Sequence, residues 1–251
     1  MSDFDRNLAT ARSGYGADQV AIDAGLRAYM IRVYNYMASG VALTGIVAWL
    51  TYSAAVQDVG GRLVLTDFGK AVYGGPVSLI LLFGTLGLVF FLSFRISRLQ
   101  PSTALTLFMV YAGLLGLMLS SIFLTYTGAS ITRTFFISAA SFGALSLYGY
   151  STERDLSPIG SFLVMGLFGL ILAMVVNFFL KSTGLDFAIS VIGVLIFAGL
   201  TAWDTQKIKE MYSANDDGTI TGRKAVMGAL TLYLDFINLF LFLLRFLGDR
   251  R

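Results

Sequence analysis

The residues "ALTLYLDFINLFLFLLRFLGDRR" at positions 229–251 are almost entirely apolar, yet Asp235 lies in the middle of their apolar part. A stretch of about 20 apolar residues is long enough to cross a bilayer as a helix. A carboxylate at bilayer depth costs at least about 2.5–3.5 kcal/mol, and such residues are usually functional. The stretch therefore predicts a membrane-spanning helix that carries a functional acid.

The composition of the whole chain also indicates a membrane protein. Of its 251 residues, 56% are hydrophobic and only 13% are charged, whereas soluble domains carry about 25% charged residues. The net charge of +3 comes from 18 Lys and Arg and 15 Asp and Glu. These charges form no basic cluster of the kind that a nucleic-acid surface needs, so we expect no nucleic-acid partner.

The chain contains no cysteine and no histidine. It therefore cannot form a disulfide, an iron–sulfur cluster, a zinc site with His or Cys ligands, or a Ser–His or Cys–His dyad. Catalysis by lysine or carboxylate groups is left open only in principle, and no nucleophile–base constellation is evident in the sequence. We expect no enzymatic activity and no cofactor, apart from a bound calcium ion.

Runs without Asp, Glu, Lys or Arg mark the expected membrane spans. They are 33–57, 71–94, 99–132, 134–152, 156–180 and 187–203, and a seventh, 225–244, is interrupted only by Asp235. The run 99–132 is too long for one span and is expected to hold one helix plus a turn near "TYTGAS". The run 187–203 is short and needs its polar flank through Gln206 to cross the bilayer. The sequence predicts an all-α integral membrane protein with seven transmembrane helices.

All three prolines support this division of the chain. Pro76, Pro101 and Pro158 each stand at the start of an expected span, where the missing N–H of proline costs nothing. Ser157, directly before Pro158, is expected to be the N-cap of its helix.

The first 32 residues are polar and mixed in charge, without the pattern of a signal peptide. We expect residues 1–32 to be a flexible or amphipathic cytoplasmic tail, 33–248 to be the transmembrane domain and 249–251 to be a C-terminal tail. When the seven spans alternate, the 18 Lys and Arg divide as 11 on the N-terminal side and 7 on the other. The positive-inside rule then places the N-terminus in the cytoplasm and the C-terminus outside.

Two acids lie within or at the edge of these spans. Asp204 occurs in "GLTAWDTQKIKEMY", near the end of the sixth run, and Asp235 lies in the seventh. Both runs adjoin the loop 205–224, so both acids lie toward the cytoplasmic side. Two facing carboxylates in a low dielectric cannot both ionise cheaply, so we expect the pair to share a proton. Such a pair can sense pH, or bind a hard divalent cation such as calcium once both protons leave.

Other polar groups near this pair are open to two interpretations. Asn238 lies three residues after Asp235 on the same helix face and can add an amide oxygen. The alternative for Asp204 and Asp235 is that each only hydrogen-bonds a neighbouring helix or reaches water. Arg95 and Arg98, at the end of the second run, can snorkel to the interface, or one of them can turn inward and latch the aspartate pair in a closed state.

The loop "SANDDGTITGRK" (213–224) matches a calcium-binding loop at several offsets. It has Ser213 where such a loop needs Asp, and Lys224 where it needs a bidentate Glu. We interpret it as a polar surface turn.

Four segments of the chain resemble the Bax inhibitor-1/YccA family of multi-pass membrane proteins. The signature segments are "GLTAWDTQKIKEMY" (199–212) and "ALTLYLDFINLFLFLLRFLG" (229–248). The middle region "LSLYGYSTERDLSPIGSFLVMGLFGLILAMVVNFF" (145–179) and the entry to the first helix, "AGLRAYMIRVYNYMASGVALTG" (24–45), are also similar. The resemblance covers about residues 20–248 and is closest to bacterial members.

The resemblance implies a seven-helix fold whose last helix is central and wrapped by the other six. It also implies a pH-sensitive calcium leak channel of the inner membrane, in which Asp204 and Asp235 form the sensing pair. A basic residue of the second helix latches that pair in the family, and Arg95 and Arg98 match it equally well. Bacterial relatives are also described as binding the membrane protease FtsH, and animal relatives as suppressing cell death.

Two hypotheses lead, and a secondary transporter is a third that the sequence leaves open. The first is a proton-gated calcium leak channel, and the second is a non-conducting regulator that binds FtsH. A retinal-type receptor is rejected because 225–247 contains no lysine for a Schiff base. A secondary transporter would be expected to show inverted repeats or broken helix pairs, and no such pattern is evident.

Overall fold

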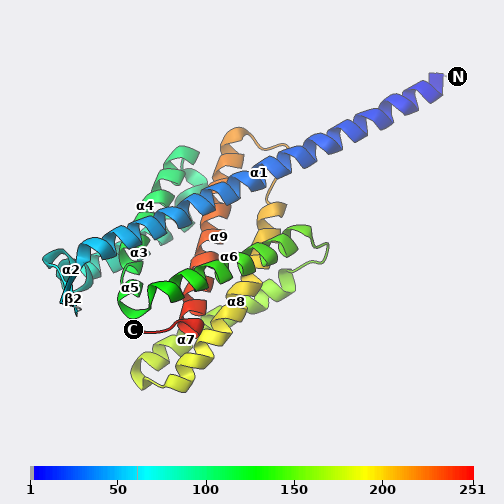
Figure 1. Ribbon diagram of the computed structural model, residues 1–251. Helices are drawn as coiled ribbons and strands as arrows, with labels where there is room; N and C mark the ends of the chain where they lie inside the picture. The colour runs from blue at the N-terminus through cyan, green and yellow to red at the C-terminus, as the bar shows by residue number, and fades with distance from the viewer. Residues whose placement is uncertain (1–2, 61) are drawn as a thin grey trace.

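Figure 1 shows a computed structural model of the protein, which describes the backbone of residues 3–60 and 62–251 and the side chains of residues 23–60 and 62–251. Six of the described helical segments are long and apolar enough to cross a membrane. They are Asp23–Ala55, Pro76–Arg98, Pro101–Thr125, Ser157–Leu180, Thr183–Glu210 and Gly218–Leu247. The prediction of an all-α membrane protein is therefore confirmed.

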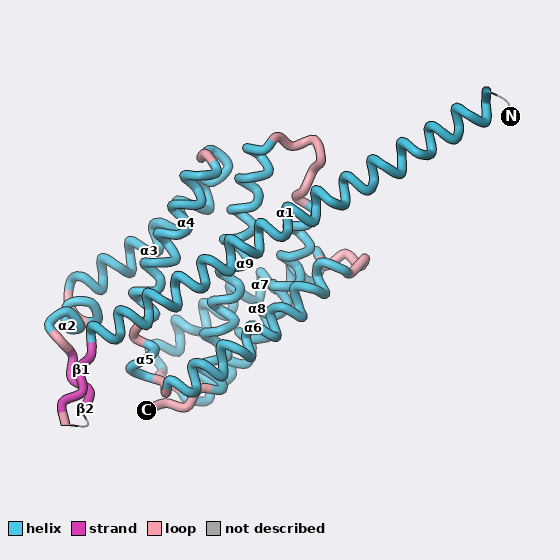
Figure 2. Tube along the Cα trace, turned by 45° about the horizontal axis from the view of Figure 1, so that its top comes forward, coloured by secondary structure: helices cyan, strands magenta, loops and turns pink. Residues whose placement is uncertain are grey.

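The chain begins with a long helix and a small hairpin. Helix α1 (Asp3–Ala55) runs without a break through the expected boundary at residue 33, so the limits of the N-terminal tail stay a prediction. Strands β1 (Val56–Val59) and β2 (Arg62–Leu65) then pair antiparallel at the end of α1 opposite the N-terminus (Figure 2). The sequence analysis did not predict this hairpin.

The remaining elements are helices joined by short loops. They are α2 (Asp67–Tyr73), α3 (Pro76–Arg95), the 3₁₀ turn η1 (Ile96–Arg98), α4 (Pro101–Leu119), α5 (Ile122–Thr125), α6 (Gly128–Ser151), α7 (Ser157–Leu180), α8 (Thr183–Glu210) and α9 (Gly218–Leu247). The run 99–132 thus contains a long helix followed by a turn before α6, as predicted. Helix α8, which contains the run 187–203, continues beyond Gln206 to Glu210, also as predicted.

The three prolines occupy the first turns of α3, α4 and α7, as expected. The prediction for Ser157 is wrong, because Leu156 is the N-cap and Ser157 is the first residue of α7. Asp155 explains the difference, since its Oδ1 accepts the backbone N–H of Ser157 at 2.8 Å. A carboxylate two residues earlier thus satisfies an N–H of the first helical turn.

Helix α9 is the most buried of the six candidate spans. Within its most apolar 18 residues 72% are buried, against 44% for α8 and 11% for α3 and α7. It packs against α1, α4, α6 and α8, whereas α3 packs on α4 and α7 packs on α8. An acid in the middle of α9 is therefore surrounded largely by protein.

Candidate functional site

The site is built where α8 and α9 lie side by side. These two helices are consecutive in the chain and make the most extensive helix contact of the described residues. The start of α9 is fixed by Asp217, whose Oδ1 accepts the backbone N–H of Ile220 at 2.7 Å. Because one short loop joins the two helices, the last turns of α8 lie beside the first half of α9.

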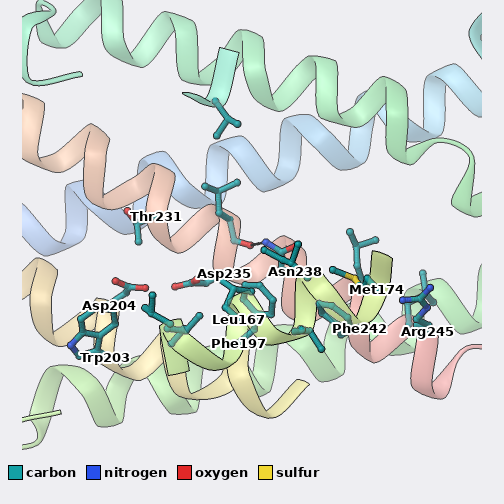
Figure 3. A pocket seen from close by; sticks show the side chains of 18 of the residues that line it. Leu167, Met174, Phe197, Trp203, Asp204, Thr231, Asp235, Asn238, Phe242 and Arg245 are labelled. Carbon is teal, nitrogen blue, oxygen red and sulfur yellow. Dashed lines mark hydrogen bonds between the residues drawn. The ribbon is translucent and has the colours of Figure 1, made fainter. Parts of the chain in front are cut away.

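The structure brings Asp204 and Asp235 together, as the sequence predicted. Asp204 is 9% exposed and Asp235 is 5% exposed. Figure 3 shows the two side chains pointing toward one another, and the carboxyl groups are close enough to hydrogen-bond when one carries a proton. The Oδ2 of Asp235 is buried and has no hydrogen-bond partner among the described residues. A shared proton or a bound cation would satisfy it.

Both aspartates line a cavity of about 1070 Å³. Side chains of α3, α7, α8 and α9 form most of its wall, and Asn238 contributes a polar group beside the pair. The Nδ2 of Asn238 donates to the backbone oxygen of Leu234 at 2.8 Å, so the amide oxygen is the atom left to accept a ligand. The predicted accessory residue is therefore in the same cavity as the aspartate pair.

The described residues contain no group of three or more acidic side chains that could hold a metal ion. Calcium takes six to eight oxygen ligands. Asp204, Asp235 and Asn238 supply fewer than that, so water would have to complete the coordination.

The two candidate latch residues lie apart from the cavity. Arg95 ends α3 and Arg98 ends η1, and both side chains are exposed. Neither is among the residues that line the cavity. The latch role of Arg95 or Arg98 stays a prediction.

Two basic residues that were not predicted from the sequence, Lys207 and Arg245, line the cavity. Lys207 interacts electrostatically with Asp204, and its ammonium lies 4.9 Å from the centre of the Trp203 ring. Its spacing of three residues from Asp204 was a usable signal. Arg245 lies at the opposite end of the labelled side chains in Figure 3 and pairs with Asp186 at 3.0 Å. That partnership is tertiary and has no sequence signal.

The polar surface turn at 213–224 has its own internal contacts. Lys224, which stands where a calcium loop needs a glutamate, forms an ion pair with Asp216. Asp217 is used as the N-cap of α9.

The fold and the site define a multi-pass helical membrane protein with a buried carboxyl pair between its last two helices. The family model "Inhibitor of apoptosis-promoting Bax1" matches residues 26–251. The chain belongs to this family, the Bax inhibitor-1 family, as the resemblance of the four segments indicated.

Similar proteins occur in several bacteria. The chain is 49% identical to protein RP147 of Rickettsia prowazekii, over 100% of both chains. It is also 49% identical to the inner membrane protein YbhL of Escherichia coli, over 91% of this chain and 94% of the relative. A third relative, YrjE of Lactococcus lactis, is 39% identical over 89% of this chain and 92% of its own length.

Proposed function

We propose that the protein is a pH-sensitive calcium leak channel of the bacterial inner membrane, gated by protonation of the Asp204–Asp235 pair. The observation that carries the proposal is the approach of two buried carboxyl groups inside one cavity between membrane-spanning helices. The name of the relative YbhL supports the inner-membrane location.

The chemistry of the pair predicts how calcium flux depends on pH. A proton and a calcium ion compete for the same carboxylate oxygens, because both neutralise charge that the low dielectric penalises. When one carboxyl of the pair carries a proton, the pair has one negative charge less and attracts a cation more weakly than the doubly ionised pair does. Calcium flux is therefore expected to rise with pH and to fall when the pair takes up its proton.

Flux through reconstituted liposomes that contain a calcium dye tests this proposal. Wild-type protein is expected to give more flux at alkaline than at acidic pH. Asp235→Asn removes one of the two coupled carboxyl groups while keeping its shape, so the flux through this variant should depend on pH less strongly than the wild-type flux. Asp67→Asn is the matched control, because the Asp67 side chain is 99% exposed on α2. Equal, pH-independent flux through wild type and Asp235→Asn would refute the proposal.

The proposal includes a seventh span, α6, and a central position for α9. Helix α6 has 24 residues, which is about 36 Å at about 1.5 Å per residue and exceeds the hydrocarbon thickness of about 30 Å. Its hydroxyl residues Ser130, Thr134, Ser138 and Ser146 are buried, whereas Phe136 and Leu147 are exposed. These four hydroxyl groups therefore face the bundle, and they lower the mean hydropathy of α6 without being exposed to lipid.

The absence of cysteine in the sequence allows a clean test of this topology. Single cysteines at Glu153 and Asn215 are expected to react with impermeant thiol reagents from the cytoplasmic side, and single cysteines at Asp67 and Lys181 from the outside. If α6 does not cross the membrane, residues 153 and 215 become accessible from the outside and residue 181 from the cytoplasmic side. That result would contradict the seven-span arrangement.

A second candidate function is regulation of the membrane protease FtsH without conduction. The observation that favours it is the N-terminal part of α1, which extends well beyond the other helices in Figure 1. A projecting helix can reach a partner in the same membrane. Deletion of residues 1–22 is then expected to abolish co-purification of the protease from native membranes, while the flux in liposomes stays unchanged. Co-purification that survives the deletion would contradict this role of α1.

A further inference from the structure

The cavity beside the aspartate pair has a wall that is mostly apolar. Its α7 side consists of Val164, Leu167, Leu170, Ile171 and Met174. Protein interiors are close-packed and contain few voids larger than a water molecule. A cavity of about 1070 Å³ is slightly larger than the usual range of small-molecule sites, roughly 300–1,000 Å³. The apolar part of the wall offers water few hydrogen bonds and suits an apolar occupant, whereas the polar groups lie at the end that holds the aspartate pair.

The cavity reaches the lipid-facing surface between α3 and α7. Helix α3 packs on α4 and α7 packs on α8, and both helices contribute side chains to the wall of the cavity. Phe90 of α3 and Ile171 of α7 line the cavity, and they are also 58% and 43% exposed. In a chain that spans a membrane, exposed apolar side chains of the spanning helices contact acyl chains. The occupant can therefore enter sideways from the bilayer.

The end of the cavity that holds Asp204 also carries an ammonium group, which partly offsets the charge of the carboxyl pair. Lys207 lines the cavity three residues beyond Asp204, near the end of α8. Its ammonium lies over the Trp203 ring at 4.9 Å, which holds the charge at the boundary between the apolar wall and the helix end. Figure 3 shows Trp203 next to Asp204 at one end of the labelled side chains, with the apolar residues Leu167, Phe197, Phe242 and Met174 extending away from it.

We propose that this cavity is a binding site for a membrane phospholipid, whose acyl chain lies along α7 and α9 and whose phosphate is bound by Lys207. A long apolar wall that is open to the bilayer fits the chain, and a single ammonium at its end fits an anionic headgroup. Basic residues near the membrane surface attract anionic lipids in this way. Lipid binding here does not depend on calcium conduction, because it rests only on the cavity and its opening.

The chain offers a direct probe of this site. It has two tryptophans, of which Trp203 lines the cavity and Trp49 is 57% exposed on α1. Trp49→Phe leaves Trp203 as the only tryptophan. Phospholipids with brominated acyl chains quench tryptophan fluorescence on contact, so they are expected to quench Trp203 in mixed bilayers. Trp203 fluorescence that no brominated lipid quenches would overturn the proposal.

A matched pair of variants separates lipid in the cavity from lipid around the protein. Val164→Phe adds bulk inside the cavity, whereas Val175→Phe adds the same bulk on the exposed side of the same helix. In the Trp49→Phe background, Val164→Phe should lower the affinity for brominated lipid about tenfold, the factor for losing roughly two buried methylene groups. Val175→Phe should leave it unchanged. Equal quenching curves for the two folded variants would overturn the proposal.

The headgroup assignment has its own control. Lys207→Gln should lower the preference for brominated phosphatidylglycerol over brominated phosphatidylcholine about fivefold, the factor for one basic residue at an anionic surface. Lys209→Gln removes a charge two residues away whose ammonium donates to the Tyr150 backbone oxygen at 2.8 Å, and it should leave the preference unchanged. A preference that survives Lys207→Gln would overturn the role of Lys207. Calcium flux is not measured in any of these assays, so a failed channel proposal would not affect their outcome.

Discussion

Replacement of Gly149 by alanine is expected to disturb the contact between α6 and α8. A Cβ added at Gly149 would lie 2.0 Å from the backbone oxygen of Ala202, whereas ordinary contacts begin at 3.4 Å. The obstructing atom belongs to a helix backbone and cannot rotate away, so α6 and α8 must separate. Overpacking of this kind costs about 1–3 kcal/mol in free energy of unfolding.

Gly143, on the same helix, is the matched control. A Cβ there would meet no atom within 4 Å, and alanine in a helix is favoured over glycine by roughly 0.5–1 kcal/mol. Unfolding of purified protein in mixed detergents should therefore show Gly149→Ala to be less stable than wild type and Gly143→Ala to be at least as stable. If both variants are equally stable, the close approach of α6 and α8 at this position is wrong.

The same substitution should also affect the aspartate pair. Ala202 is two residues before Asp204 on α8, so a separation of α8 from α6 moves Asp204 relative to Asp235. The proposed pH-dependence of calcium flux is therefore expected to weaken in Gly149→Ala and to persist in Gly143→Ala. An unchanged pH profile in a demonstrably destabilised Gly149→Ala would show that the pair tolerates this displacement.

Three further variants test individual contacts. Gln206→Ala should lower the free energy of unfolding by about 1–3 kcal/mol, because the Gln206 side-chain amide forms hydrogen bonds of 2.8 Å with two backbone groups of the α6–α7 loop. Proteolysis of that loop should become faster. An unchanged rate of proteolysis would contradict the role of Gln206 in holding the loop. Tyr233→Phe should lower the free energy of unfolding by about 1 kcal/mol, because the buried hydroxyl group of Tyr233 forms a hydrogen bond of 2.7 Å with the Thr44 hydroxyl. An unaltered unfolding midpoint in detergent would argue against this hydrogen bond. Hydrogen bonds from the side chain and backbone of Ser157 hold the pKa of Asp155 below its ordinary value in the folded protein. The ionised carboxylate therefore stabilises the fold at any pH above the ordinary pKa of the unfolded chain. This contribution is lost as the pH falls through the lowered pKa of the folded state. Ser157→Ala should raise the pKa of Asp155 toward its ordinary value in an NMR titration, and a pKa that does not move would rule out the hydroxyl as a cause.

Local features of the sequence were sufficient to place most helices. Proline at the first turn, charge-free runs and the break in 99–132 depend on backbone chemistry and residue solubility, which act within one segment. The N-cap at Ser157 was wrong because a competing carboxylate two residues earlier satisfies the same turn. The hairpin at 56–65 was missed because each strand has only four residues.

The sequence by itself determined that the chain is a helical membrane protein and that Asp204 and Asp235 are unusual enough to form a site. It could do so because the cost of a charge in lipid depends on residue type and on position within one span. Only the tertiary structure decided that the two carboxyl groups meet and that Lys207 rather than Arg95 or Arg98 shares their cavity. Those features depend on the packing of α3, α7, α8 and α9, and no single segment encodes the spacing between helices.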